Sequence, residues 1–247
     1  FYGTANSNQM LMEFMGLHLP GSSFVPPNSL LRTALTYQGT AKIIANTALG
    51  ERYIHTANIL SEKAWVNGIV GLMATGGSTN LVLHLPAMAR AAGVILKPQD
   101  FADISEIVPL LAKVYPNGLA DVNHFHAAGG LPFIIGQLLD ADLLHEDVIT
   151  VMGKGLSGYA AQAMLSGDEV TYVTAPRKSL NDKIVRSVAE PFAASGGLKN
   201  LVGNIGSAVI KVSAVAENKR FIEAPAAVFR TQEAVKEAFQ AGKLNRD

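Results

Sequence analysis

The stretch that most constrains the fold is residues 75–80, TGGSTN, which lies between two apolar segments. Apolar residues recur at helical spacing in residues 61–74 and again in 81–92, and the second segment stops at Gly93. The last three residues of the stretch are types preferred at helix N-caps. The sequence therefore predicts a helix, a glycine turn and a second buried helix.

Two interpretations of this turn remain open on the pattern alone. A glycine turn before a helix directs backbone N–H groups and hydroxyls toward one point, where they can hold a carboxylate, a phosphate or a hydroxyl group. In the alternative, Gly76 and Gly77 only allow two buried helices to pack closely.

The rest of the chain mixes helical and strand patterns. Helical spacing predicts further helices at residues 4–19, 29–49, 121–128, 131–139, 159–165 and 231–241. Short runs rich in β-branched residues predict strands at residues 94–96, 148–152, 198–202, 208–215 and 226–229. Residues 100–104 are typical of a loop, and the polar segment 175–195 is typical of a linker. We therefore expect an α/β fold with a domain boundary near residue 190.

Composition excludes several classes of protein. Of the 247 residues 49% are hydrophobic and 16% are charged, which favours a large buried core and argues against disorder. The net charge is zero, with no basic run of the kind that binds nucleic acid or a membrane surface. No apolar run reaches the roughly 18–20 residues of a membrane span. The chain has no cysteine, so it cannot supply a disulfide or a thiolate metal site by itself.

Histidines are the first candidates for chemistry. His124 and His126 would project about 200° apart on a helix and could share a metal only on a strand. His84 lies one helical turn after Asn80, so it could reach the glycine turn or serve as a hydrogen-bonded core residue. The segment 153–155, GKG, is either a weak anion site or a plain turn.

Several of these segments together resemble a known family. Residues 2–6 (YGTAN), 19–23 (LPGSS) and 75–80, followed by His84, resemble the dihydroxy-acid and phosphogluconate dehydratase family. Residues 115–118 (YPNG) and 121–125 (DVNHF) resemble its phosphogluconate branch. The resemblance extends over essentially the whole chain.

The resemblance implies both a fold and an activity. Residues 1–190 would be part of an N-terminal α/β domain, and residues 191–247 would begin a β-barrel-like C-terminal domain. The activity would be dehydration of 6-phospho-D-gluconate to 2-dehydro-3-deoxy-6-phosphogluconate, a step of the Entner–Doudoroff pathway. The alternatives are a dehydratase of an unphosphorylated aldonic or dihydroxy acid, and a cluster-free relative that only binds sugar acids.

The resemblance also implies a cofactor that this chain cannot hold alone. Family members use an iron–sulfur cluster bound by three cysteines, for which 4Fe–4S is favoured over 2Fe–2S, together with a nearby divalent cation. Because the chain has no cysteine, we expect those ligands and the catalytic base to lie outside it. The chain would then be an internal fragment, inactive alone, of a cytoplasmic homodimer that acts on a phosphorylated sugar acid and binds neither nucleic acid nor membrane.

Within this chain, the resemblance places residues in the wall of the substrate pocket and assigns no catalytic residue or metal ligand. Thr4 and Asn6 would lie beside the missing cysteine. The residues expected to face the substrate are Ser78, Thr79, Asn80 and His84. Those expected at its phosphate or sugar end are Asn123, His124 and His126.

Overall fold

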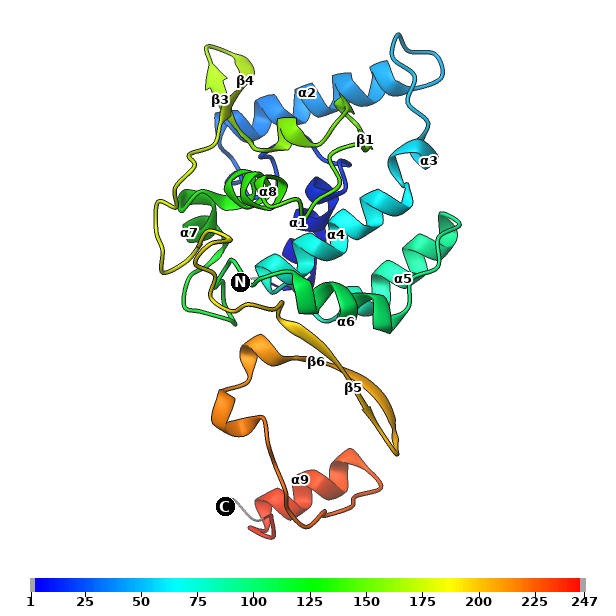
Figure 1. Ribbon diagram of the computed structural model, residues 1–247, viewed down its shortest axis with the longest axis vertical. Helices are drawn as coiled ribbons and strands as arrows, with labels where there is room; N and C mark the ends of the chain where they lie inside the picture. Colours follow the sequence, from blue (N-terminus) through cyan, green and yellow to red (C-terminus); the bar gives the residue numbers. More distant parts are fainter. Residues whose placement is uncertain (1–2, 245–247) are drawn as a thin grey trace. The chain divides into compact units, whose positions relative to one another are not determined.

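The computed structural model describes residues 3–244, and the chain divides into two compact units, Phe1–Val215 and Ala216–Asp247. Figure 1 shows the order of the elements. The helices of the first unit are α1 (Thr4–Phe14), α2 (Leu30–Asn46), α3 (Thr56–Ile59), α4 (Glu62–Thr75), α5 (Leu81–Ala91), α6 (Pro98–Ile107), α7 (Val122–Ala127) and α8 (Gly130–Asp140). The second unit contains the 3₁₀ turn η3 (Glu217–Lys219) and α9 (Gln232–Gln240).

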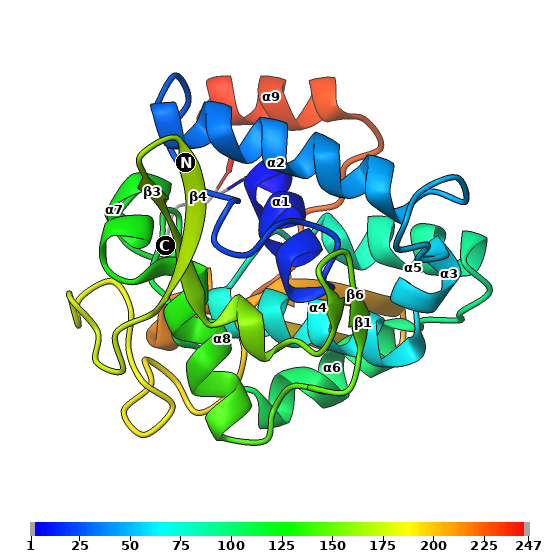
Figure 2. The ribbon, with the colours of Figure 1, turned by 90° about the horizontal axis from the view of Figure 1, so that it is seen from above.

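The strands of the first unit form antiparallel hairpins. The pairs are β1 (Ile149–Thr150) with β2 (Gly153–Lys154), β3 (Ala161–Ser166) with β4 (Glu169–Thr174), and β5 (Leu198–Gly203) with β6 (Gly206–Lys211). The 3₁₀ turns η1 (Ser157–Tyr159) and η2 (Val212–Ala214) follow β2 and β6. The β3–β4 hairpin lies against α2, as Figure 2 shows. The mixed helix and strand content agrees with the expected α/β composition.

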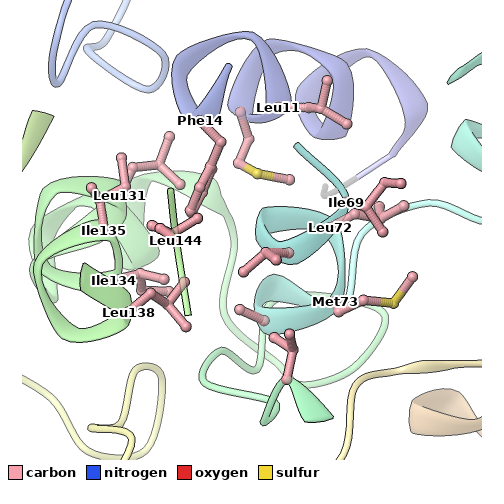
Figure 3. Packing of buried hydrophobic residues seen from close by; sticks show 14 of the residues in the cluster. Leu11, Phe14, Ile69, Leu72, Met73, Leu131, Ile134, Ile135, Leu138 and Leu144 are labelled. Atoms are coloured by element: carbon pink, nitrogen blue, oxygen red, sulfur yellow. The ribbon is translucent and has the colours of Figure 1, made fainter. Parts of the chain in front are cut away.

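Helix α4 forms the centre of the first unit. The Ser61 hydroxyl accepts a hydrogen bond from the Ala64 N–H at its start, and Gly76, with φ of 60°, ends it in the left-handed region. Helices α1 and α6 pack against it. Figure 3 shows the side chains of α1, α4 and α8 that meet in this core, among them Leu11, Phe14, Ile69, Leu72, Met73, Leu131, Ile134, Ile135 and Leu138.

Two glycines on α4 allow α1 to approach closely. A Cβ atom added to Gly71 would lie 2.5 Å from the ring of Phe14, and one added to Gly68 would lie 3.0 Å from Met15 Cγ. Both contacts involve fully buried side chains that have little room to shift. The missing side chains of Gly68 and Gly71 therefore allow the end of α1 to lie close to the middle of α4.

Most of the predicted helices are confirmed to within a few residues. The predictions for residues 29–49, 61–74, 81–92, 121–128, 131–139 and 231–241 correspond to α2, α4, α5, α7, α8 and α9. The prediction for residues 4–19 was too long, because α1 ends at Phe14 and the chain turns at Gly16, where φ is 73°.

Other predicted elements were wrong. The supposed loop at 100–104 lies inside α6, where Pro98 takes the first helical position and the Asp100 carboxylate accepts a hydrogen bond from Lys97 N–H at 2.7 Å. The helix predicted at 159–165 is largely strand β3, which the turn at Gly167 (φ 63°) pairs with β4. Residues 94–96 and 226–229 form no strand, and the strands predicted at 148–152 and 208–215 are shorter.

A buried carboxyl group anchors the loop that follows α1. Glu13 is fully buried; its Oε1 accepts a hydrogen bond from Gly21 N–H (2.5 Å), and its Oε2 accepts bonds from the Ser23 N–H and hydroxyl (3.1 and 2.5 Å). Burial raises the pKa of Glu13 to about 7, although the three hydrogen bonds and the nearby Arg32 oppose that shift. The loop is thus fixed to α1 by a carboxyl group that is only partly ionised at neutral pH.

The close contact of α1 and α4 predicts the effect of adding one methyl group. Gly71→Ala in the longer protein should lower the free energy of unfolding by about 1–3 kcal/mol, because the new Cβ overlaps the Phe14 ring. Urea unfolding followed by circular dichroism measures the change. Gly158→Ala is the matched control, since no atom lies within 4 Å of the added Cβ there. Equal stability of the two variants would contradict this packing.

The pKa of Glu13 predicts a pH dependence of stability. The pKa of Glu13 in the folded state lies above the ordinary value of 4.5. The stabilisation of the folded state by Glu13 is therefore complete below pH 4.5 and is lost as pH rises through about 7. The stability of the wild type relative to Glu13→Gln should therefore fall by about 3 kcal/mol over that interval, at about 1.4 kcal/mol per pKa unit. Urea unfolding across this pH range measures the difference. The exposed Glu51→Gln serves as control, and a pH-independent difference for Glu13→Gln would refute the prediction.

Candidate functional site

The first turn of α1 meets the glycine turn that precedes α5. The hydroxyl oxygens of Thr4 and Ser78 are 3.1 Å apart, a hydrogen-bond distance. The Asn80 side-chain amide donates to Thr4 Oγ1 at 2.7 Å, and the Asn80 backbone N–H donates to Ser78 Oγ at 3.3 Å. We call these three residues the hydroxyl cluster. Thr79 lies in the same turn and is partly buried.

Three further residues hold the glycine turn in place. Ser7 Oγ accepts a hydrogen bond from Ser78 N–H at 3.0 Å, and the Asn117 amide donates to the Gly76 carbonyl at 2.7 Å. The Ser213 hydroxyl in turn donates to Asn117 Oδ1 at 2.9 Å. These supporting residues were not predicted from the sequence. Asn117 could have been considered, because it lies in the PNG turn, whereas no pattern in the sequence indicates a role for Ser213.

The hydroxyl cluster has the chemistry of a binding site for polyols or carboxylates. One hydroxyl proton serves the bond between Thr4 and Ser78, and the second has no acceptor among residues 3–244. The Asn80 side-chain oxygen likewise receives no hydrogen bond from the described residues. A neutral donor and a neutral acceptor next to each other can bind a hydroxyl or carboxylate group, but they do not provide an acid or a base.

Asn6 and Asn123 lie at a second place. Asn6 follows Thr4 by two residues, so its side chain projects about 200° away around α1. Asn6 and Asn123 line a cavity of about 240 Å³ together with Gln9, Ser23 and Arg32. We call this cavity the Arg32 pocket. Gln9 and Arg32 were not candidates from the sequence, since the pocket joins segments far apart in the chain.

The three candidate histidines differ in surroundings. Burial, and then the charge of Arg32, lowers the pKa of the partly buried His126, so its ring is neutral at neutral pH. His124 is exposed, and its backbone N–H donates to the Asp121 carboxylate at 3.0 Å in the cap of α7. That hydrogen bond is the main cause of the lowered pKa of Asp121. His84 is exposed on α5.

The structure therefore distributes the nine candidates over several places rather than one. Thr4 of α1 meets Ser78 and Asn80 in the hydroxyl cluster, and Thr79 lies in the same turn as the latter two. Asn6 and Asn123 share the Arg32 pocket, and the histidines lie outside its lining and outside the cluster. Because α7 is a helix, the rings of His124 and His126 project about 200° apart. Lys154, the centre of the GKG segment, lies in the β1–β2 hairpin.

Metal-ligating side chains do not gather in the part of the chain that the structure describes. Among residues 3–244 no three His, Cys, Asp or Glu side chains are placed to hold a metal ion. None of the helices described for those residues has both the length and the apolar character needed to cross a bilayer.

Known proteins are similar to this chain over nearly its whole length. The family model described as "Dihydroxy-acid/6-phosphogluconate dehydratase N-terminal" matches residues 1–159, and the corresponding C-terminal model matches residues 183–247. The chain is 56% identical over 248 residues to a phosphogluconate dehydratase of Rhizobium meliloti (strain 1021) and 52% identical over 247 residues to one of Escherichia coli (strain K12).

A more distant relative has a different activity in its name. A dihydroxy-acid dehydratase of Caldanaerobacter subterraneus subsp. tengcongensis is 37% identical over 245 residues, or 98% of this chain. The two phosphogluconate dehydratases match the whole chain, and the chain spans 41% of the length of all three relatives. The chain belongs to the dihydroxy-acid/6-phosphogluconate dehydratase family.

Proposed function

We propose that this chain is part of a hydro-lyase that dehydrates 6-phospho-D-gluconate to 2-dehydro-3-deoxy-6-phosphogluconate, in the Entner–Doudoroff pathway. The observation that carries the proposal is identity of 56% and 52% to phosphogluconate dehydratases along the entire chain. The chain spans about two fifths of those relatives, so the activity belongs to the longer protein. The fragment alone would be inactive.

The contribution of this chain to the reaction would be substrate binding. The hydroxyl cluster offers a free hydroxyl proton and a free amide oxygen, which suit the hydroxyl and carboxylate groups of a sugar acid. Its supports from Ser7 and Asn117 fix the turn before substrate arrives, which reduces the entropy lost on binding. Thr79 and His84, on the same turn and the following helix, would complete this wall of the pocket.

The residues of this chain do not fit an iron–sulfur cluster by themselves. The chain has no cysteine, and residues 3–244 bring no three metal-ligating side chains together. We propose that the longer protein uses such a cluster, 4Fe–4S in preference to 2Fe–2S, with a divalent cation, and that all their ligands lie outside this chain.

The finer architecture is also a proposal. The C-terminal family model begins at residue 183, which supports a domain boundary near residue 190. We propose that a β-barrel-like domain begins after that boundary. The contacts divide the chain later, after Val215, so that the β5–β6 hairpin belongs to the first unit. The longer protein would be a cytoplasmic homodimer.

A dehydratase of an unphosphorylated acid is the second candidate. It is favoured by the 37% identity to a dihydroxy-acid dehydratase over 98% of the chain. A cluster-free protein that only binds sugar acids would retain the hydroxyl cluster without any turnover.

Anaerobic turnover of the longer protein distinguishes these functions. The substrates to compare are 6-phosphogluconate, gluconate and 2,3-dihydroxyisovalerate, and we expect turnover of 6-phosphogluconate in clear preference to the other two. Turnover of only an unphosphorylated acid would support the second candidate. A protein with its cluster bound and no turnover of any substrate would support the binding protein.

Removal of one hydroxyl tests the hydroxyl cluster. Ser78→Ala in the longer protein should reduce kcat/KM at least about tenfold, which corresponds to about 1.4 kcal/mol of lost binding in the transition state. The free energy of unfolding should change by no more than about 1 kcal/mol, because Ser78 is only partly buried. Steady-state kinetics and urea unfolding measure the two effects, with the exposed Ser166→Ala as control. A large loss of stability with unchanged turnover per folded molecule would instead assign Ser78 to packing.

A further inference from the structure

The Arg32 pocket lies between three segments that the fold holds rigidly. Asn6 and Gln9 lie on one side of α1, Arg32 lies in the first turn of α2, and Asn123 lies at the start of α7. The loop that precedes α2 is joined to α7 by an edge-to-face contact of Phe24 and Phe125, whose ring centroids are 5.7 Å apart. The pocket is therefore formed by tertiary packing rather than by one mobile loop.

The guanidinium group of Arg32 is only partly used by the protein. Its Nη2 donates to the carbonyls of Ser22 and Val25, at 2.5 and 2.8 Å, which fixes the position of the group. Its Nε and Nη1 have no hydrogen-bond partner among residues 3–244. Among residues 3–244, only Trp65 Nε1 is a fully buried side-chain polar atom without a hydrogen-bond partner. Because Nε and Nη1 of Arg32 also lack a partner, neither atom is fully buried, and both reach open space.

The charge of Arg32 is not neutralised within the described chain. No carboxylate of residues 3–244 forms an ion pair with Arg32. The charge of Glu13 raises the pKa of Arg32, but Glu13 is only partly ionised at neutral pH because its own pKa is about 7. Burial lowers the pKa values of His18 and His126, and the Arg32 charge lowers them further. Arg32 is thus a fixed cation whose positive potential extends to its surroundings.

The remaining lining suits an oxyanion with several oxygens. The carboxamides of Gln9 and Asn123 carry N–H donors, and no carboxylate is among the described residues that line the pocket. A guanidinium group donates charge-assisted hydrogen bonds to phosphate oxygens, and Nε or Nη1 of Arg32 can donate one here. At about 240 Å³ the pocket is smaller than the usual sites for whole ligands, about 300–1,000 Å³, and fits one end of a substrate.

The pocket also lies at a suitable place relative to the hydroxyl cluster. Thr4 and Asn6 are on opposite sides of the first turns of α1, so the two groups are separated by about one helix diameter, roughly 10 Å. That separation is comparable with the length of an extended six-carbon chain that carries a terminal phosphate. One substrate molecule could therefore contact both places across the start of α1.

We propose that the Arg32 pocket binds the phosphate group of the substrate and that Arg32 determines selectivity for phosphorylated over unphosphorylated sugar acids. The proposal rests on the proposed function, and it names the residues that recognise the phosphate of that substrate. Arg32 would contact a phosphate oxygen through Nε or Nη1, while Nη2 keeps its bonds to the loop.

The test is a comparison of variants of the longer protein with 6-phosphogluconate. Asn123→Asp places a negative charge in the pocket with almost no change of shape, at an exposed position where an acidic residue suits a helix N-terminus. Arg32→Lys keeps the charge and removes the planar guanidinium group. Lys42→Gln is the control, because Lys42 lines a neighbouring pocket that Arg32 also borders, but not this one.

We expect KM for 6-phosphogluconate to rise about tenfold or more in Asn123→Asp and Arg32→Lys, with kcat changed less than about twofold. Like charges weaken binding of the phosphate in the first variant, and loss of the guanidinium hydrogen bond weakens it in the second. Competitive inhibition by inorganic phosphate should weaken in parallel, whereas Lys42→Gln should match the wild type. Thermal unfolding verifies that each variant is folded. If Arg32→Lys does not fold, Asn123→Asp still tests the pocket.

The outcomes separate this proposal from the proposed function. If the wild type turns over 6-phosphogluconate and KM is unchanged in Asn123→Asp, the proposed function stands and the phosphate pocket is refuted. An equal effect in Lys42→Gln would assign the phosphate to the neighbouring pocket and also overturn the proposal. If the wild type turns over only unphosphorylated acids, the proposed function fails first and the phosphate site fails with it.

Discussion

The close contact of α1 with α4 is the constraint on which the rest of the first unit depends. Gly71 leaves room for the Phe14 ring, so the two helices approach more closely than any larger side chain at that position would allow. This approach brings the first turn of α1 beside the turn at the end of α4, and there Ser7 accepts the Ser78 N–H. A packing feature of the hydrophobic core thus positions the polar residues of the hydroxyl cluster.

A second feature uses ionisable groups rather than apolar contacts. Glu13 holds the loop after α1 through three hydrogen bonds, and Arg32 holds the following residues through the carbonyls of Ser22 and Val25. The two groups attract each other but form no ion pair in the described chain, and burial keeps Glu13 partly protonated. The loop is fixed at both ends, while part of the guanidinium group remains available to a ligand. The proposed phosphate site would combine structural and binding roles in Arg32, because its five N–H donors point in different directions.

The sequence could predict the features that depend on local pattern. Helices α4 and α5 and the glycine turn follow from apolar spacing and from a residue type that tolerates positive φ, whereas the role of the turn stayed open on the pattern alone. The sequence pattern predicted the wrong secondary structure where contacts with another segment determine it. Residues 100–104 were predicted as a loop, but they lie in α6, which begins at Pro98. Residues 161–166 were predicted mostly as helix, but they form a strand because β4 pairs with them. The Arg32 pocket could not be predicted, since Asn6, Arg32 and Asn123 are brought together only by the packing of α1, α2 and α7.

We propose that one substrate molecule lies across the start of α1, between the hydroxyl cluster and the Arg32 pocket. A crystal structure of the longer protein with 6-phosphogluconate bound tests this placement most directly. We expect a phosphate oxygen within hydrogen-bond distance of Arg32 Nε or Nη1, and a hydroxyl or carboxylate oxygen of the same molecule in contact with Ser78 or Asn80. A phosphate bound elsewhere, with only water in the Arg32 pocket, would contradict it.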